Sequence, residues 1–283
     1  MLTSNLPIVA SVSGGKDSTA MCLWLKDQGL PYRAVHMDTG WEHPDTDWYI
    51  REVLDKVIGP IEWIKPKYDF VGLCRKKGIF PSRVTRFCTS ELKTLPFFRW
   101  VEDEYGTAEV RNAVGIRSQE SAARSILPEL EMCHFGDIWR PLLDWTEDDV
   151  IAIHHKHGLA PNPLYMRGAT RVGCWPCIFA RKAEIRLVSE NDPGRIDLIR
   201  CLEKELNDAT IARFALRGET PKSEMTLFWN KGALPIDAAV LWSKTKHGGK
   251  EIDDRDTSRD GCMRWGMCEV SPEEFCGISV DSE

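Results

Sequence analysis

The chain has 283 residues, of which 42% are apolar and 28% are charged. This composition supports a hydrophobic core and excludes a globally disordered protein. No apolar run approaches the roughly 18 residues that a transmembrane helix needs, so no membrane association is expected. Residues 1–5 lack the basic and apolar segments of a signal peptide, which favours a cytoplasmic location. The net charge of −6 argues against unspecific binding of nucleic acid over the whole surface.

The first half of the chain alternates between segments typical of strands and of helices. We expect strands over 7–12, 32–37, 61–64 and 109–114, and helices over 19–26, 47–58 and 91–104. Such alternation predicts an α/β fold with a mainly parallel, doubly wound sheet that is covered by helices on both faces. Ligands of these sheets bind beyond the carboxyl ends of the strands.

The second half is expected to be mostly helical. Thr146 is a helix N-cap followed by acidic residues, and the cations His154, His155 and Lys156 suit the end of that helix. A further helix is predicted over 193–207, and polar, glycine-containing residues over 245–261 are typical of a connector. We therefore expect an α/β domain over 1–190, a helical extension over 191–245, and a flexible connector with a cysteine-containing tail over 246–283.

A glycine-rich loop follows the first predicted strand and precedes a helix. Its sequence is Ser13-Gly14-Gly15-Lys16-Asp17-Ser18. The glycines allow backbone N–H groups to approach an anion, while the helix N-terminus, the lysine and the serine hydroxyls add favourable partners. The loop is not a Walker A motif, which has four residues between its first glycine and Gly-Lys. It predicts a phosphate site, with an ordinary strand-to-helix turn as the alternative.

The hexapeptide resembles the signature of the PP-loop ATP pyrophosphatases in the adenine nucleotide α-hydrolase-like superfamily. The resemblance extends over about residues 8–190. Within the superfamily, this part of the chain is similar to the phosphoadenylylsulfate (PAPS) reductase branch, to the ATP sulfurylase small subunit, and to DNA phosphorothioation proteins of the DndC and SspD type. Four further segments carry it: His36-Met37-Asp38-Thr39-Gly40-Trp41, Gly115-Ile116-Arg117-Ser118-Gln119-Glu120-Ser121, Pro141-Leu142-Leu143-Asp144-Trp145-Thr146 and Gly173-Cys174-Trp175-Pro176-Cys177.

This resemblance implies a binding site for ATP and Mg²⁺. The hexapeptide would hold the β- and γ-phosphates through Ser13, Gly14, Gly15, Lys16, Asp17 and Ser18. The segment Asp38-Thr39-Gly40 would lie near the adenosine, and Arg117 near the α-phosphate. Lys16, Asp17 and Arg117 are the expected catalytic residues, with a surface salt bridge as the alternative for Arg117.

The chain contains ten cysteines, which in a reducing compartment are better explained by metal binding or redox chemistry than by disulfides. Cys174 and Cys177 form a C-x-x-C pair, which suits a redox pair, half of a zinc site or half of an iron–sulfur site. Cys88 lies upstream in a basic segment, 71–100, and a second basic segment, 167–186, surrounds the pair. These segments favour an anionic ligand, although solvated helix faces would have the same composition.

The arrangement of these cysteines resembles that of the iron–sulfur adenylylsulfate reductases, except that Phe87 replaces one member of the upstream Cys-Cys pair. The resemblance implies a [4Fe–4S] cluster held by Cys88, Cys174, Cys177 and a tail cysteine, of which Cys268 is favoured over Cys262. Zinc is the second choice, and unliganded thiols are the third.

The last cysteine has a separate resemblance. Cys276, in Phe275-Cys276-Gly277-Ile278-Ser279, is similar to part of the C-terminal motif that carries the nucleophile of sulfonucleotide reductases, without its glutamate and histidine.

Several functions are compatible with these residues. The intact loop favours an ATP pyrophosphatase that adenylates an acceptor for sulfur incorporation, as in nucleic-acid thiolation. Its expected partners are a cysteine desulfurase or another sulfur donor and a nucleic-acid acceptor; a homodimer is left open. The alternatives are a sulfonucleotide (PAPS or adenylylsulfate) reductase, an ATP sulfurylase-like subunit and a non-catalytic nucleotide-sensing module.

Overall fold

A six-stranded sheet forms the centre of the computed structural model, which describes residues 6–106, 109–133 and 136–245. The strand order is β3-β2-β1-β4-β6-β5, and all neighbours are parallel except β5 and β6. Because the chain leaves β1 toward β2 and later returns to its other side as β4, the sheet is doubly wound. The strands are β1 Ile8–Val12, β2 Tyr32–Met37, β3 Ile61–Ile64, β4 Val110–Val114, β5 Leu130–Cys133 and β6 Gly136–Trp139.

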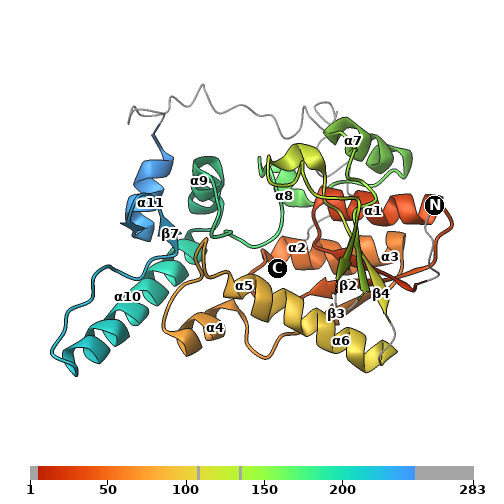
Figure 1. The fold of residues 1–283 in the computed structure, drawn as a ribbon. Helices are drawn as coiled ribbons and strands as arrows, with labels where there is room; N and C mark the ends of the chain where they lie inside the picture. Colours follow the sequence, from red (N-terminus) through yellow and green to blue (C-terminus); the bar gives the residue numbers. More distant parts are fainter. Residues whose placement is uncertain (1–5, 107–108, 134–135, 246–283) are drawn as a thin grey trace.

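Helices cover both faces of this sheet, as the alternation of segments predicts (Figure 1). Alternate residues of β1 serve different cores: Ala10 packs on the face that carries α1 and α7, and Val9 packs on the face that carries α6. The segment predicted as one helix over 47–58 is divided into α2, a π-helical turn η1 and α3. These elements are α1 Lys16–Asp27, α2 Pro44–Trp48, η1 Tyr49–Leu54, α3 Asp55–Ile58, α6 Leu95–Tyr105 and α7 Glu147–Lys156.

The strands β5 and β6 are absent from the sequence prediction. Acidic residues interrupt the apolar pattern of both strands. In β6, the acid is accommodated because a side chain of the neighbouring strand pairs with it. Asp137 of β6 is paired in register with Arg111 of β4, and its carboxylate accepts a hydrogen bond from the guanidinium at 2.9 Å. Since that partner comes from a distant segment, local periodicity does not reveal the strand.

A second core connects helices from both halves of the chain. Trp41, Phe70 and Trp175 pack with Ile199 and Ala239 in this cluster. The helix predicted over 193–207 is longer than expected and ends at Ala215. The remaining elements are α4 Phe70–Lys77, α5 Phe87–Thr89, the π-helical turn η2 Ser90–Thr94, the 3-10 turn η3 Ser118–Glu120, α8 Pro163–Met166, α9 Lys182–Asn191, α10 Pro193–Ala215, β7 Phe228–Trp229, β8 Ala233–Leu234 and α11 Ile236–Ser243.

The start of α7 is as predicted from the sequence. Thr146 is the N-cap of α7, with its side chain accepting a hydrogen bond from the Asp149 N–H at 3.2 Å, as predicted. In the part of the chain that the structure describes, no helix has the length and apolar character needed to cross a membrane.

The last turn of α7 requires a correction. His154 was expected to be one of its cations, but only 1% of the residue is exposed and its Nδ1 lies 2.7 Å from the Val150 carbonyl oxygen. Burial lowers the pKa of His154 from 6.5 to about 4, so the imidazole is neutral at neutral pH. The reason is tertiary: this face of α7 packs against α1.

A neutral buried histidine makes the stability of the protein depend on pH. Because the unfolded chain binds a proton at a higher pH than the folded chain, we expect stability that is complete above pH 6.5 and is lost as the pH falls toward 4. The loss attributable to His154 is roughly 3 kcal/mol. The free energy of unfolding, measured with urea at pH 6.5 and at pH 4, should change less between the two pH values in His154→Gln than in the wild type. His155 is exposed, so the control variant His155→Gln should show the same pH-dependent change in the free energy of unfolding as the wild type.

Candidate nucleotide site

The phosphate loop joins β1 to α1 at the carboxyl edge of the sheet. Gly15 is the N-cap of α1, and Gly14 has a φ of 71°, which favours glycine. A Cβ atom on Gly14 would lie 2.8 Å from the Thr46 methyl carbon, so the loop is also packed too closely for a side chain. Ser18 Oγ donates to the Gly15 carbonyl at 3.0 Å, and Ser13 N–H donates to Ser18 Oγ at 3.2 Å. The loop is therefore held in shape by its own hydroxyls.

The three predicted catalytic residues meet at the N-terminus of α1. Arg117 Nε donates to Asp17 Oδ1 at 2.5 Å, and Lys16 Nζ lies 3.4 Å from Asp17 Oδ2. Lys16 Nζ also lies 3.5 Å from Glu147 Oε1 at the start of α7. Only 4% of Arg117 is exposed, so the alternative of a surface salt bridge is wrong. Two cations beside a helix N-terminus form an environment that favours the phosphates of a nucleotide.

Residues outside the predicted set complete the loop. Lys16 N–H donates to the Tyr165 hydroxyl at 3.0 Å, and Asn162 Nδ2 donates to the Gly14 carbonyl at 3.2 Å. Asn162 also caps α8, since its Oδ1 accepts from Leu164 N–H at 3.0 Å. The sequence Asn162-Pro163 is a recognisable helix-start signal, but nothing local connects it with a loop so far upstream.

Gly115, directly after β4, is required by a close approach to the phosphate loop. A Cβ atom at this position would lie 2.5 Å from the Asp17 carbonyl oxygen and 2.6 Å from the Ser18 nitrogen. Both neighbours are backbone atoms at the start of a helix and cannot turn aside. Gly115 therefore sets how closely the segment carrying Arg117 approaches Asp17.

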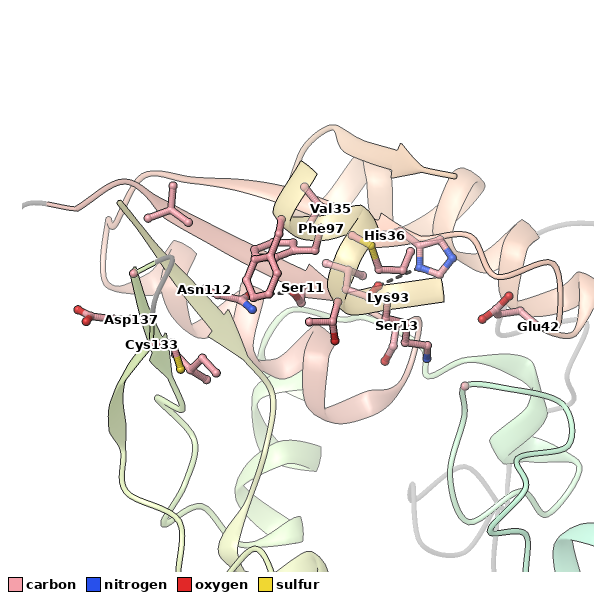
Figure 2. Close-up of a pocket in the computed structure, with 18 residues that line it drawn as sticks. Ser11, Ser13, Val35, His36, Glu42, Lys93, Phe97, Asn112, Cys133 and Asp137 are labelled. Carbon is pink, nitrogen blue, oxygen red and sulfur yellow. Dashed lines mark hydrogen bonds between the residues drawn. The ribbon is translucent and has the colours of Figure 1, made fainter. Parts of the chain in front are cut away.

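A cavity of about 270 Å³ lies next to the loop, on the face of the sheet that α6 covers. Figure 2 shows Ser11 and Ser13 between His36 on one side and Asn112 on the other. The remaining lining is largely apolar and includes Val35 and Phe97. An apolar cavity with a few polar groups, at the switch point between β1 and β4, is a typical site for a nucleoside.

The residues predicted to bind the adenosine are not in the cavity lining. The Asp38 carboxylate accepts from Gly40 N–H at 3.2 Å, and Thr39 Oγ1 donates to Glu42 at 2.7 Å. Glu42 itself lines the cavity. Trp41, which directly follows Gly40, contacts the C-x-x-C loop: its Nε1 donates to the Pro176 carbonyl at 2.9 Å.

The three predicted cysteine ligands in the described part of the chain are brought together at the same place. After burial, the charge of the Cys177 thiol contributes to raising the pKa of both Cys88 and Cys174, which places the three thiols near one another. Burial raises the pKa of Cys88 and Cys174, while the ammonium of Lys93 opposes this shift. Lys93 Nζ lies 3.7 Å from Cys174 Sγ and also lines the cavity, so the thiols and the cavity are adjacent.

The metal prediction stays a prediction. Within residues 6–106, 109–133 and 136–245, no group of three or more histidine, cysteine, aspartate and glutamate side chains has the geometry to hold a metal ion. Cys268, Cys262 and Cys276 lie outside the described residues. Of the cysteines expected to be isolated, Cys22 is buried and Cys133 and Cys201 are exposed. Cys74 is buried in the core cluster against which Cys88 packs, so it is not isolated from the predicted ligands.

Comparison with known proteins identifies the family. The phosphoadenosine phosphosulfate reductase domain matches residues 7–180, more than half of the 283 residues, and the chain belongs to this enzyme family. The resemblance to the PAPS reductase branch is thereby confirmed.

Individual relatives come from several sources. The chain is similar to a 37.8 kDa protein in the gpa 5′ region of Escherichia phage 186, with 30% identity over 87% of this chain and 90% of that protein. It is 28% identical to the adenosine 5′-phosphosulfate reductase of Allochromatium vinosum over 60% of this chain and 67% of the reductase. Among solved structures, the PAPS reductase of Candida auris superposes with a TM-score of 0.47 and 19% identity, covering 59% of this chain and 81% of that one.

Proposed function

We propose that this protein cleaves ATP to AMP and pyrophosphate and uses the adenylate to activate an acceptor for sulfur incorporation. The observation that carries this proposal is the intact phosphate loop, at which Lys16, Asp17 and Arg117 converge and whose Ser13 lines a nucleoside-sized cavity. The adjoining thiols and the basic segments around them favour an anionic acceptor, and a nucleic acid is the acceptor we propose, as in phosphorothioation.

The residues of the site suit the first step of this reaction. An acceptor oxygen attacks the α-phosphorus, and the bond to the pyrophosphate breaks in line with the attack. Lys16 and the loop N–H groups stabilise charge on the departing pyrophosphate, and Arg117 stabilises charge at the α-phosphate. Asp17 holds both cations in position. Mg²⁺ is proposed to accompany the triphosphate and to neutralise part of its charge.

The second step replaces the adenylated oxygen with sulfur. A cysteine persulfide on the donor, proposed to be a cysteine desulfurase, attacks the activated acceptor atom, and AMP leaves with the oxygen. A second thiol then cleaves the S–S bond to release the thiolated acceptor, and the disulfide formed is reduced by an external thiol.

The thiols next to the cavity are proposed to hold a [4Fe–4S] cluster, with zinc as the second choice. Thiols are the usual ligands of such clusters, and the ammonium of Lys93, 3.7 Å from Cys174 Sγ, would offset thiolate charge there. The described cysteines do not form a complete ligand set by themselves, so the proposal requires a further ligand from the tail. Cys268 would be the fourth ligand. When bound, such a cluster supplies Lewis-acid and one-electron chemistry.

A sulfonucleotide reductase is the second candidate. The similarity to the Allochromatium vinosum enzyme favours it, as does the resemblance of the C-x-x-C pair to those of such reductases. The intact phosphate loop favours ATP cleavage instead, since a reductase does not release pyrophosphate. An ATP sulfurylase-like subunit would leave the C-x-x-C pair without a role.

The deciding experiment is anaerobic purification followed by incubation with ATP and Mg²⁺, with assays for AMP, pyrophosphate, bound iron and sulfide. With no acceptor present, water attacks the α-phosphorus in its place, so we expect AMP and pyrophosphate in equal amounts from an iron-containing protein. Thiol-dependent release of sulfite from adenylylsulfate, without ATP cleavage, would identify a reductase. Pyrophosphate release only in the presence of sulfate would indicate the sulfurylase-like function, and ATP binding without cleavage would indicate a sensing module.

A further inference from the structure

A second concave surface lies along η2 and α6, next to the nucleotide cavity. This groove, of about 470 Å³, runs between the end of β3, α4 and the outer face of α6. Figure 1 shows α4 and α6 on the same side of the molecule, next to β3. Cations and aromatic rings distinguish its lining. We call it the aromatic-basic groove and define it by six lining residues: Trp63, Lys67, Tyr68, Lys76, Arg99 and Trp100.

Among the described residues that line this groove, cations outnumber acids. Lys67, Lys76 and Arg99 are exposed, and none of them forms an ion pair with a described acid. Lys65 at one end pairs with Asp38 at 3.6 Å. Two acids also line the groove: Glu91, which pairs with Lys77, and Asp103. Three unpaired cations in one groove favour a ligand that carries several negative charges.

The aromatic rings indicate what kind of anion this is. Trp63, Tyr68 and Trp100 are half-buried, so each ring presents part of its surface to the groove. Cations already lie over them: Lys76 Nζ is 4.6 Å from the Tyr68 ring centroid, and the Arg33 guanidinium carbon is 4.7 Å from that of Trp100. A basic groove lined with aromatic rings is the arrangement by which proteins bind single strands, with phosphates on the cations and bases against the rings.

The groove shares two walls with the nucleotide cavity. Glu91 and Leu92 of the π-helical turn η2 line the groove, whereas Lys93 and Thr94 of the same turn line the cavity. In addition, Trp63 of the groove is in edge contact with His36 of the cavity, with ring centroids 4.5 Å apart. A strand bound in the groove would therefore lie one helical turn away from the nucleotide and from Lys93, which contacts Cys174.

We propose that the aromatic-basic groove binds a single-stranded nucleic acid and thereby delivers the acceptor to the nucleotide cavity. The second part of this inference rests on the proposed function. The first part, the binding of a strand, does not depend on whether ATP is cleaved.

Binding is tested with a fluorescein-labelled oligothymidylate by anisotropy over a range of salt concentrations. We expect Lys67→Gln/Lys76→Gln to bind at least about 10-fold more weakly than the wild type. The slope of log K against log salt should fall by roughly 1.4, because each phosphate contact on a single strand contributes about 0.7. The matched control, Lys204→Gln/Lys222→Gln, removes two charges from exposed lysines outside the groove and should bind like the wild type.

Two further probes test the rings and the identity of the strand. An abasic oligonucleotide of the same length should bind at least about 10-fold more weakly, because it keeps the phosphates and lacks the stacking bases. Duplex DNA should also bind more weakly, and oligouridylate shows whether the groove distinguishes RNA from DNA. Equal binding by the groove variant and the control variant, or by the abasic and the complete strand, would overturn the proposal.

ATP cleavage by the same variants separates this inference from the proposed function. The groove variant should retain ATP cleavage without acceptor, since neither lysine contacts the phosphate loop. A wild type that cleaves ATP but does not bind the oligothymidylate would overturn the groove alone. A wild type that binds the strand through these lysines but releases no pyrophosphate would overturn the proposed function and leave the groove supported.

Discussion

Replacing Asp17 with asparagine is expected to lower pyrophosphate release from ATP by a factor of about 100 to 1,000. The carboxylate accepts from Arg117 Nε at 2.5 Å and lies 3.4 Å from Lys16 Nζ, so it orients the two cations that the proposed mechanism places at the phosphates. The amide keeps the size of the side chain but lacks its negative charge. Lys16→Ala should have an effect at least as large, because the cation itself is lost. Steady-state assays of pyrophosphate release measure both effects.

The matched control is Asp27→Asn, at the other end of the same helix, where the carboxylate pairs with Lys156 at 2.6 Å. This variant makes the same chemical change and should retain activity near that of the wild type. Urea unfolding of both variants checks that the folded state is present under the assay conditions. Full turnover by folded Asp17→Asn and by folded Lys16→Ala would exclude the phosphate loop from the reaction.

Gly115→Ala is expected to disturb the phosphate loop from the segment that follows β4. The new Cβ would lie 2.5 Å from the Asp17 carbonyl oxygen and 2.6 Å from its carbonyl carbon, so the N-terminus of α1 or the segment after β4 must shift. Overpacking of this kind costs about 1–3 kcal/mol in the free energy of unfolding. Because the same contact sets the distance between Arg117 and Asp17, we expect a loss of ATP cleavage of about 100-fold in the protein that remains folded.

Gly194→Ala is the corresponding control for this substitution. Gly194 is exposed in the first turn of α10, and its added Cβ would meet no atom closer than the Asp192 carboxylate oxygen at 3.7 Å. Alanine favours a helix over glycine, so this variant should unfold at an equal or higher urea concentration than the wild type. If Gly115→Ala were as stable and as active as Gly194→Ala, the close approach at the phosphate loop would be refuted.

Local sequence is a good guide to the elements that carry the nucleotide site. The strands over 8–12, 32–37, 61–64 and 110–114 follow from short apolar runs that end in turn residues. The phosphate loop is a continuous hexapeptide. Its glycines, its lysine and its position before a helix are enough to predict an anion site. For these features, the residues that define the structure are neighbours in the chain.

Features that depend on partners from distant segments were missed. The pair Arg111 and Asp137 stabilises β6, which contains an acid that a periodicity argument counts against a strand. Tyr165 and Asn162 hold the phosphate loop from nearly 150 positions further along the chain. His154 reads as a helix-end cation, and only its packing against α1 makes it neutral.

The sequence by itself determined the four central parallel strands of the sheet and the phosphate loop, because each is encoded by a local pattern or a short motif. Tertiary structure alone decided that Arg117 is buried against Asp17, that Lys93 connects the thiols to the cavity, and that cations from α4, α6 and the segment after β3 meet in one groove. The physical reason is that burial and charge pairing depend on distances between segments, which the folding of the chain creates and no single segment contains.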